Sequence, residues 1–315
     1  METHWQEINN YVINRAKTLL STTNSTFVLG AGVSKDANIP DWETLLAKLI
    51  PTKDTVFRPT DYKAINKHLN HSDIRAARYI KSAFYQKDLN DKDSNDNIFV
   101  DKVRKILYSS IDRESPLIKT ICDIICDDSK RVQSVITYNY DDVIEEELKK
   151  RGFEHYSVFR KNRSNDYYKF PIYHVHGFVP QIGNASKIVL CEEDYHEIYS
   201  YAFHWSNIEQ LHAFERNTCF FIGLSMNDPN LRRLLEVAFK DSEQEQSHFI
   251  FLPRTPLFTS DEETPNREQK IDEDFSIREE VLHKLGLQII WYEDGKFEQI
   301  NSILKQIGNI DEPML

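Results

Sequence analysis

Three apolar segments of this chain each end in a glycine, a pattern that could bind a nucleotide. The glycines are Gly30, Gly177 and Gly223. The chain holds 9 glycines in 315 residues, where average usage would give roughly 22, so those that remain indicate positions that tolerate no side chain. Glycine lets a backbone approach a ligand closely. Three strands that end in this way predict a parallel sheet with a nucleotide across its carboxyl edge.

The first of these turns is Gly30-Ala31-Gly32, which follows a short apolar strand expected at 26–29. A strand that leads through glycine into a helix presents backbone N–H groups to a pyrophosphate. The third glycine of the dinucleotide fingerprint is replaced by Lys35, and no acidic residue has an obvious ribose-binding role about 20 positions later. Taken alone, the turn fits phosphate binding and a plain tight turn equally well. Ser34 either contacts phosphate or caps the following helix, and capping is slightly favoured.

Polar residues follow a second buried strand, expected at 132–137. Asn139 and Asp141 lie after its carboxyl end, where the side chains of a parallel sheet converge on a ligand. Asparagine and aspartate after a strand are also common turn and capping residues. This simpler interpretation suits Asp142 well and Asp141 fairly well.

A histidine stands at the end of a third strand. Imidazole has an ordinary pKa of about 6.5, so His176 could act as a general base. A lone histidine is more often structural than catalytic, and His174, two residues earlier, points to the same face of the strand. Gly223 and Ser225 end a later strand, and their small side chains would let another part of a nucleotide approach.

The elements that must position these residues alternate along the chain. Strands are expected at 26–29, 132–137, 172–175, 188–190, 218–222, 249–252 and 287–292, and helices at 4–20, 42–50, 141–150, 193–215, 229–240, 279–285 and 297–307. Short strands that alternate with helices predict an α/β fold with a Rossmann-like, mainly parallel sheet flanked by helices.

The chain is expected to form one domain, 1–315, with a helical insertion at 51–118 packed beside the sheet. Within the insertion, the polar stretch 86–97 predicts a mobile loop. Residues 254–276 are polar and interrupted by proline, so they predict a second loop.

Composition and charge narrow the function classes. Lysine and arginine total 39 against 50 aspartates and glutamates, a formal net charge of −11 that argues against wide contact with nucleic acid. The basic run Arg160-Lys161-Asn162-Arg163 is better interpreted as a solvated loop. No run approaches the roughly 18 apolar residues of a membrane helix, and the first residues do not resemble a signal peptide. The chain has 4 cysteines, which indicate a reducing compartment. We therefore expect a cytoplasmic protein that contacts no membrane.

Taken together and in this order, the motifs resemble those of the sirtuin family. Sirtuins carry a GAGxS turn, an I-P-D segment, a T-x-N-x-D element, a catalytic H-G and a late G-(T/S)-S strand end. Here residues 30–34, 39–41, 137–141, 176–177 and 223–225 read GAGVS, IPD, TYNYD, HG and GLS. The T-x-N-Y-D form, the pair Asp194-Tyr195 and the G-x-S-x-x-D-P-N-L run from Gly223 to Leu231 are similar to the bacterial sirtuin-like branch of anti-phage systems, such as the Thoeris effector.

The resemblance implies a role for each candidate residue in binding and cleaving NAD. Asn139 would hold the ribose or the attacking water, and His176 would contact the ribose hydroxyls and act as a base. Asp141 would bind the carboxamide of nicotinamide. The remaining binding positions are the pyrophosphate turn Gly30, Ala31, Gly32 and Ser34, the segment ending at Asp41, and Gly223 and Ser225 beside the adenosine half. Asp41 also suits the dipole of the following helix. It is followed by Trp42, whereas many deacetylases have the sequence D-F-R here. This departure leaves the pose of the nicotinamide half of NAD open.

One departure from the family decides between its reactions. Deacetylating sirtuins carry a zinc module built from two CxxC pairs. Here Cys122 and Cys126 have CxxxC spacing on an expected apolar helix, and Cys191 and Cys219 stand alone. The resemblance therefore implies an NAD⁺ glycohydrolase that needs no zinc and no cofactor beyond NAD as its substrate.

Other functions fit the same residues. A non-catalytic sensor of NAD or ADP-ribose and an ADP-ribosyl transferase are the alternatives, and protein deacylation ranks last. A constitutive NAD hydrolase would kill its own cell, so the resemblance implies a gated effector of abortive infection. The gate is expected to be a homo-oligomer, a separately encoded regulatory partner protein, or both. The first helix and the insertion offer faces for such contacts, although ordinary packing explains such faces more often.

Overall fold

The computed structural model describes residues 4–50, 61–85, 92–112, 114–161, 168–201, 203–240, 248–255 and 267–310. By its internal contacts the chain divides into two compact units. Unit 1 contains Met1–Val28, Lys119–Val135 and Glu209–Leu315, and unit 2 contains Leu29–Ile118 and Ile136–Ile208. The expected single domain with an insertion at 51–118 stays a prediction.

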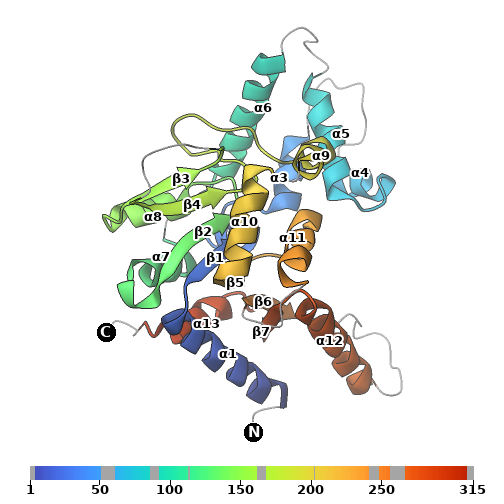
Figure 1. Cartoon of the computed structure of the whole chain (residues 1–315). Helices are drawn as coiled ribbons and strands as arrows, with labels where there is room; N and C mark the ends of the chain where they lie inside the picture. Colours follow the sequence, from blue (N-terminus) through green and yellow to red (C-terminus); the bar gives the residue numbers. More distant parts are fainter. Residues whose placement is uncertain are drawn as a thin grey trace. The chain divides into compact units, whose positions relative to one another are not determined.

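In the described part of the chain, seven parallel strands form one sheet in the order β3-β4-β2-β1-β5-β6-β7, flanked by helices (Figure 1). The strands are β1 (Ser25–Leu29), β2 (Val132–Thr137), β3 (His155–Val158), β4 (Phe170–His174), β5 (Thr218–Ile222), β6 (His248–Arg254) and β7 (Leu287–Glu293). The pairs β3/β4, β5/β6 and β6/β7 are parallel. Parallel neighbours need crossover connections, which the helices supply. The predicted Rossmann-like α/β fold is confirmed.

Helices precede, connect and follow the strands. They are α1 (His4–Thr22), α2 (Ala31–Lys35), α3 (Trp42–Leu49), α4 (Tyr62–His68), α5 (Asp73–Tyr85), α6 (Lys92–Leu107), α7 (Pro116–Cys126), α8 (Val143–Lys150), α9 (Glu192–Ser200), α10 (Trp205–Arg216), α11 (Pro229–Phe239), α12 (Arg267–His283) and α13 (Gln299–Gly308). Helices α4, α5 and α6 confirm that the described residues of 51–118 are mainly helical. No helix in the described ranges combines the length and the apolar character that a membrane crossing requires.

Aromatic packing dominates the core of unit 1. Phe27 of β1 lies 5.8 Å from Phe220 of β5, measured between ring centroids, and Phe220 stacks on Phe249 of β6 at 5.4 Å. The three side chains are at most 1% exposed. Full burial of one such ring contributes about 1.5–3 kcal/mol, so these contacts fix the strands of the unit against one another.

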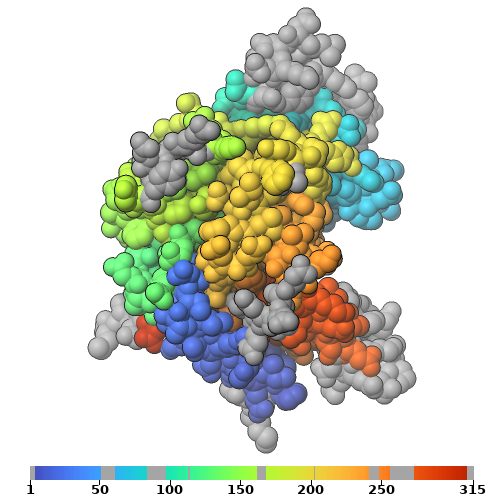
Figure 2. Space-filling view, viewed as in Figure 1, coloured from blue at the N-terminus to red at the C-terminus, as the bar shows by residue number. Residues whose placement is uncertain are grey.

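A buried amide attaches α1 to the last strand of the sheet. The Nδ2 of Asn9 donates to the carbonyl of Trp291 at 2.9 Å, and the N–H of Trp291 donates to the Oδ1 of Asn9 at 2.8 Å. The side chain thus takes the place of a neighbouring strand along β7, which protects that strand edge. Part of α1 lies at the surface (Figure 2). Its residues Ile8 and Tyr11 are 49% and 69% exposed.

Ion pairs join α5 to α9 within unit 2. Lys81 pairs with Asp194 at 3.3 Å, and both side chains are largely buried. The carboxylate of Asp194 also accepts the N–H groups of Leu190 and Cys191, at 3.1 and 2.9 Å. Burial opposes ionisation of Asp194, but these hydrogen bonds and the Lys81 charge hold its pKa below the ordinary value. The segment before α9 is therefore anchored to α5.

Two segments differ from the sequence-based expectation within unit 2. The prediction of a loop over 86–97 is wrong for 92–97, because α6 begins at Lys92; residues 86–91 lie outside the described residues. The prediction of a strand at 188–190 is also wrong. The N–H of Val189 donates to the carbonyl of His176, and the Val189 carbonyl accepts the hydroxyl of Tyr140, both at 2.7 Å. These backbone groups therefore bond outside a strand ladder.

Three further features of the fold differ from the sequence-based expectation. Strand β3 has no counterpart among the expected strands, because three of its four residues are only half-buried at the sheet edge and its apolar pattern is weak. The expected helix 193–215 is divided into α9 and α10. The loop expected at 254–276 is wrong from residue 267 onward, where α12 begins.

Residues 177–189 form a clasp, a loop that returns to hold the end of β4. The N–H of Ser186 donates to the carbonyl of Phe178 at 2.7 Å, and the N–H of Phe178 donates to the Ser186 hydroxyl at 2.6 Å. Gly177 begins the clasp with φ +99°, and a Cβ placed there would lie 2.3 Å from the carbonyl oxygen of Lys187. The chain therefore requires glycine directly after His176.

We expect Gly177→Ala to destabilise the protein by more than about 2 kcal/mol, because it combines backbone strain of about 1–2 kcal/mol with a backbone clash. Gly183→Ala is the matched control: its φ is +109°, but a Cβ there meets nothing within 4 Å. Urea unfolding of both variants measures the difference. Equal destabilisation would show that the close approach to Lys187 has no energetic consequence.

Candidate functional site

Three strand ends lie side by side in unit 2. The N–H of Tyr138 donates to the carbonyl of Leu29 at 2.9 Å, and the N–H of Val175 donates to the carbonyl of Thr137 at 3.1 Å. These bonds join the carboxyl ends of β1, β2 and β4. The segments that leave those ends carry most of the candidate residues, so this edge is where the predicted chemistry would occur.

Two hydrogen bonds fix the side chain of Asn139 to the turn after β1. Its Nδ2 donates to the carbonyl of Gly30 at 2.9 Å and to the hydroxyl of Ser34 at 2.8 Å. Because a carbonyl can only accept, Nδ2 rather than Oδ1 must face this turn. Both amide hydrogens are thereby used. The Oδ1 of the side chain can therefore accept a hydrogen bond from a ligand.

Ser34 connects Asn139 to Asp141. It lies inside α2 and is 2% exposed. Its hydroxyl accepts a hydrogen from Asn139 and makes a second hydrogen bond to the carboxylate of Asp141. A hydroxyl that accepts one hydrogen can donate its own, so a chain of donors runs from Asn139 through Ser34 to Asp141. Helix capping, the slightly favoured interpretation of Ser34, is wrong.

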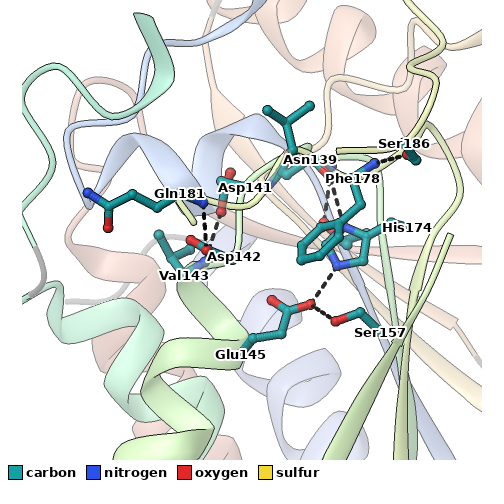
Figure 3. Close-up of polar contacts among 12 residues, drawn as sticks. Asn139, Asp141, Asp142, Val143, Glu145, Ser157, His174, Phe178, Gln181 and Ser186 are labelled. Atoms are coloured by element: carbon teal, nitrogen blue, oxygen red, sulfur yellow. Dashed lines mark hydrogen bonds and ion pairs between the residues drawn. The ribbon is translucent and has the colours of Figure 1, made fainter. Parts of the chain in front are cut away.

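The carboxyl of Asp141 is buried, with 5% of the residue exposed. Desolvation raises its pKa to about 6, and the negative charges of Glu145 and Asp142 act in the same direction. The Ser34 hydroxyl and the N–H of Val143, 3.3 Å from Oδ1, oppose this rise (Figure 3). At neutral pH the folded protein therefore holds a desolvated negative charge next to the Asn139 segment.

Asp142 has a structural role. Its carboxylate accepts the Tyr108 hydroxyl at 3.0 Å and the N–H of Gln181 at 2.8 Å. Burial raises its pKa, and those two hydrogen bonds oppose the rise. It occupies the N-cap position of α8 without a capping bond from its side chain. The residue joins Tyr108, just after α6, and the clasp to the start of α8, in a different way from the simple cap that the sequence favours.

The ring of His176 is packed between two tyrosines. Its centroid lies 4.7 Å from that of Tyr138 and 5.4 Å from that of Tyr195, with edge-to-face angles of 79° and 80°. His176 is 5% exposed. Tyr138 directly precedes Asn139, so the imidazole and the candidate amide come from segments in contact. The structure thus brings both predicted catalytic residues to one edge.

The glycine turn begins a very short helix. Gly30 is the N-cap of α2 with φ −119° and ψ −177°, so Ala31 and Gly32 form the first helical turn. Asp41 caps α3 by accepting the N–H of Thr44 at 3.0 Å, and its carboxylate lies 3.1 Å from the Nζ of Lys35. Partial burial opposes ionisation of Asp41, but these contacts hold its pKa below the ordinary value. The position of Asp41 at a helix start is confirmed.

Gly223 and Ser225 belong to unit 1. They follow β5, and Gly223 has φ +70°. The next helix, α11, begins at Pro229 with Asp228 as its N-cap, whose carboxylate accepts the N–H of Leu231 at 2.7 Å. The turn after β5 therefore leads into a capped helix. The adenosine-binding role of its small residues stays a prediction.

The sequence did not single out Glu145 and Ser157, which surround His174. His174 is fully buried; its Nδ1 lies 3.2 Å from the Asn139 carbonyl, and its Nε2 lies 2.5 Å from the Oε1 of Glu145 (Figure 3). The Ser157 hydroxyl donates to the same Oε1 at 2.8 Å. The two histidines, His174 at the end of β4 and His176 just after it, were visible in the sequence, but nothing in it showed that α8 supplies the carboxylate.

A separate cavity of about 460 Å³ lies between α6 and the clasp. Its lining includes Lys81, Arg104 and Lys187 and none of the candidate residues. Each of these cations is paired: Lys81 with Asp194, Arg104 with Asp101, and Lys187 with Glu197. The cavity is accordingly not the candidate site.

No group of three or more histidine, cysteine, aspartate or glutamate side chains within the described residues is arranged to hold a metal ion. None of the four cysteines, all within the described residues, forms a disulfide; Cys122, Cys191 and Cys219 are buried, and Cys126 is half-buried. Cys122 and Cys126 lie on α7, the apolar helix expected from the sequence.

Replacement of Asp141 by asparagine should stabilise the protein at neutral and alkaline pH. Between the ordinary value of 3.8 and the folded value of about 6, the folded state binds more protons than the unfolded state. Stability is therefore lost as pH rises through this window. Asp141→Asn keeps the hydrogen-bonding shape without the charge, so we expect a gain of the order of 1–3 kcal/mol at pH 8 and a smaller gain at pH 5.

Urea unfolding at both pH values tests this expectation. Asp128→Asn, at an exposed position, is the control and should change stability little at either pH. A loss of stability on Asp141→Asn at pH 8 would contradict the buried-charge interpretation.

Comparisons with known proteins bear on the same segment. Residues 133–279 match the family model described as a SIR2-like domain. A solved structure described as "Structural Basis for the Mechanism and Regulation of Sir2 Enzymes" is 12% identical to this chain, with a TM-score of 0.41, and the match covers 95% of this chain and 98% of that one. A search of curated proteins found no match. Over residues 133–279, which include Asn139, Asp141 and His176, the chain is sirtuin-like, as its motifs predict.

Proposed function

We propose that this chain is an NAD⁺ glycohydrolase, which cleaves the bond between nicotinamide and ribose and releases nicotinamide and ADP-ribose. The observation that carries the proposal is the double hydrogen bond from the Asn139 amide to Gly30 and Ser34. It fixes an acceptor oxygen at the strand ends, beside a glycine turn suited to pyrophosphate. The SIR2-like match over residues 133–279 supports NAD as the ligand.

The bond to be broken sets what the protein must provide. Nicotinamide leaves as a neutral molecule from a cationic pyridinium, so the reaction needs no general acid. The enzyme must orient the ribose, stabilise positive charge on the sugar and admit one water. In this proposal the Oδ1 of Asn139 accepts a hydrogen from a ribose hydroxyl or from the attacking water.

His176 is the proposed base and ribose contact. Its edge-to-face packing between Tyr138 and Tyr195 restricts rotation of the ring. A ring held in one orientation keeps its nitrogens in a fixed place relative to the strand ends, as a catalytic group requires. The aromatic neighbours also reduce access of bulk water, which strengthens electrostatic interactions in the site.

Asp141 is the proposed acceptor for the carboxamide N–H groups of nicotinamide. Its desolvated carboxylate also favours the positive charge that develops on the ribose. Backbone N–H groups at Gly30, Ala31 and Gly32 are proposed to bind pyrophosphate. The roles of Gly223 and Ser225 at the adenosine half rest on the sequence motifs.

The biological setting belongs to the same proposal. The T-x-N-Y-D form of residues 137–141 and the run from Gly223 to Leu231 support an NAD-depleting effector of anti-phage defence. Such an enzyme must stay inactive until infection. We expect the gate to be self-association or a separately encoded partner protein.

Asn139→Ala and His176→Ala should each lower the rate of nicotinamide release at least about 100-fold, the scale expected when an orienting group or a general base is lost. The matched controls are Asn184→Ala and His196→Ala, at exposed positions of unit 2, which should cleave NAD like the wild type. Chromatographic assay of nicotinamide, with circular dichroism to establish folding, provides the measurement. Unchanged rates in both site variants would exclude the proposed site.

The pH dependence should reflect Asp141. Because its pKa is raised to about 6, the carboxylate is protonated below that pH. It then accepts from the carboxamide more weakly and no longer carries the charge that favours a cationic ribose. We expect kcat/KM for NAD to fall below about pH 6 and to reach a plateau above it. In Asp141→Asn the profile should lose this acid limb and lie below the wild-type plateau. An acid limb unchanged by the substitution would assign the titration to another group.

A further inference from the structure

One buried ionisable pair in unit 2 is not used by the proposed chemistry. His174 is 0% exposed and Glu145 is 7% exposed. They lie on different elements, β4 and α8, and their side chains meet behind the Asn139 segment (Figure 3). Burying such a pair costs several kcal/mol in desolvation, and apolar residues of similar size often serve stability equally well. The position of the pair therefore calls for a reason other than stability.

The hydrogen bonds determine where the protons of this pair lie. The Nδ1 of His174 faces the carbonyl of Asn139 at 3.2 Å, and a carbonyl can only accept, so Nδ1 carries a hydrogen. The Nε2 faces a carboxylate oxygen of Glu145, so a second proton lies between these two atoms. Burial raises the pKa of Glu145, but the charge and hydrogen bond of His174 and the Ser157 hydroxyl outweigh it and hold that pKa low. Glu145 thus fixes the direction of the ring.

Packing holds the imidazole in this orientation. The ring of Phe178 lies 4.2 Å from the ring of His174, measured between centroids. Phe178 is in turn bonded through its N–H and its carbonyl to Ser186 of the clasp. The His174 ring therefore has a carboxylate on one side, an aromatic ring against it and the Asn139 backbone on the other side.

The bond to Asn139 completes a set of restraints on one residue. The N–H of Asn139 donates to the Thr137 hydroxyl at 3.0 Å, and its side chain is fixed by Gly30 and Ser34. Its carbonyl is held by His174. Loss of that last bond would free the peptide plane between residues 139 and 140 and shift the amide relative to its ligand.

We propose that His174 is a positioning residue for the reaction, acting through its Nδ1–H bond to the Asn139 carbonyl, with Glu145 orienting the ring. The functional part of this inference rests on the proposed NAD cleavage, whereas the restraint on Asn139 does not. His174 touches no reacting atom. Its effect is transmitted by the backbone that carries the amide.

Two substitutions at one position separate positioning from stability. In His174→Asn, the shorter amide occupies the place of Nδ1 and can donate to the Asn139 carbonyl, but it leaves Glu145 without its partner. In His174→Gln, the longer amide reaches Glu145 and does not donate to Asn139. Because an unpaired buried charge is strongly destabilising, the asparagine variant should be the less stable of the two.

The expected activities run in the opposite order. His174→Gln should release nicotinamide about 10- to 100-fold more slowly than the wild type, the scale expected when an orienting contact is lost. His174→Asn should stay within about tenfold, and KM should change little in either variant. A role in stability alone predicts that activity follows thermal stability, with the asparagine variant worse. That order would overturn the proposal.

A second variant keeps the test decisive if His174→Asn folds poorly. In Glu145→Gln the neutral amide can donate to Nε2, so a neutral His174 keeps its Nδ1–H bond to Asn139. We expect Glu145→Gln to retain more activity than His174→Gln. Equal losses in these two variants would contradict positioning through the Asn139 carbonyl.

Hydrogen exchange tests the restraint without any assay of NAD. Peptides that cover residues 137–142 should exchange faster in His174→Gln than in Glu145→Gln or the wild type. Equal exchange in all three proteins would refute the restraint. If the exchange difference is present and wild-type protein releases no nicotinamide in any assembly state, alone or with its partner protein, the proposed function fails and the positioning of Asn139 stands.

Discussion

The hydrogen bonds of one amide hold the candidate site together. Asn139 donates both side-chain hydrogens to the turn after β1, while its own backbone follows β2. A single side chain thereby joins two strand ends that are distant in the sequence, and the acceptor-only nature of the Gly30 carbonyl determines which amide atom faces outward. The position of Ser34, the burial of Asp141 and the bond from His174 all depend on where this residue lies.

Buried charge around this residue has an energetic cost. Asp141 carries a pKa raised to about 6 by desolvation, and the charge of Glu145 contributes to that rise. Glu145 itself is compensated by His174 and Ser157, whereas Asp141 has a hydroxyl and a backbone N–H in place of a cation. Such an arrangement reduces stability at neutral pH, and functional sites are where proteins retain it. The fold tolerates the charge because the surrounding hydrogen bonds fix its place.

The fold followed from the sequence where local pattern and tertiary structure agree. Strands β2 and β5 begin and end as predicted, since each is a short run rich in β-branched or aromatic residues. Residues 188–190 have the same pattern, yet their backbone bonds to His176 and Tyr140, which no local signal reveals. The location of Asn139 and His176 at one edge followed from the rule that parallel strands end at the same edge of a sheet. The contacts of Ser34 did not, because a five-residue helix is too short to show a period, and Glu145 is brought to His174 only by the packing of α8 on the sheet.

The most direct test of the central claim is a crystal structure of the His176→Ala protein with NAD bound. The account predicts that the nicotinamide ribose lies at the ends of β1, β2 and β4, with a ribose hydroxyl or an ordered water about 2.6–3.2 Å from the Oδ1 of Asn139. A ribose bound elsewhere, for example in the cavity between α6 and the clasp, or an Asn139 amide turned away from Gly30 and Ser34, would contradict it.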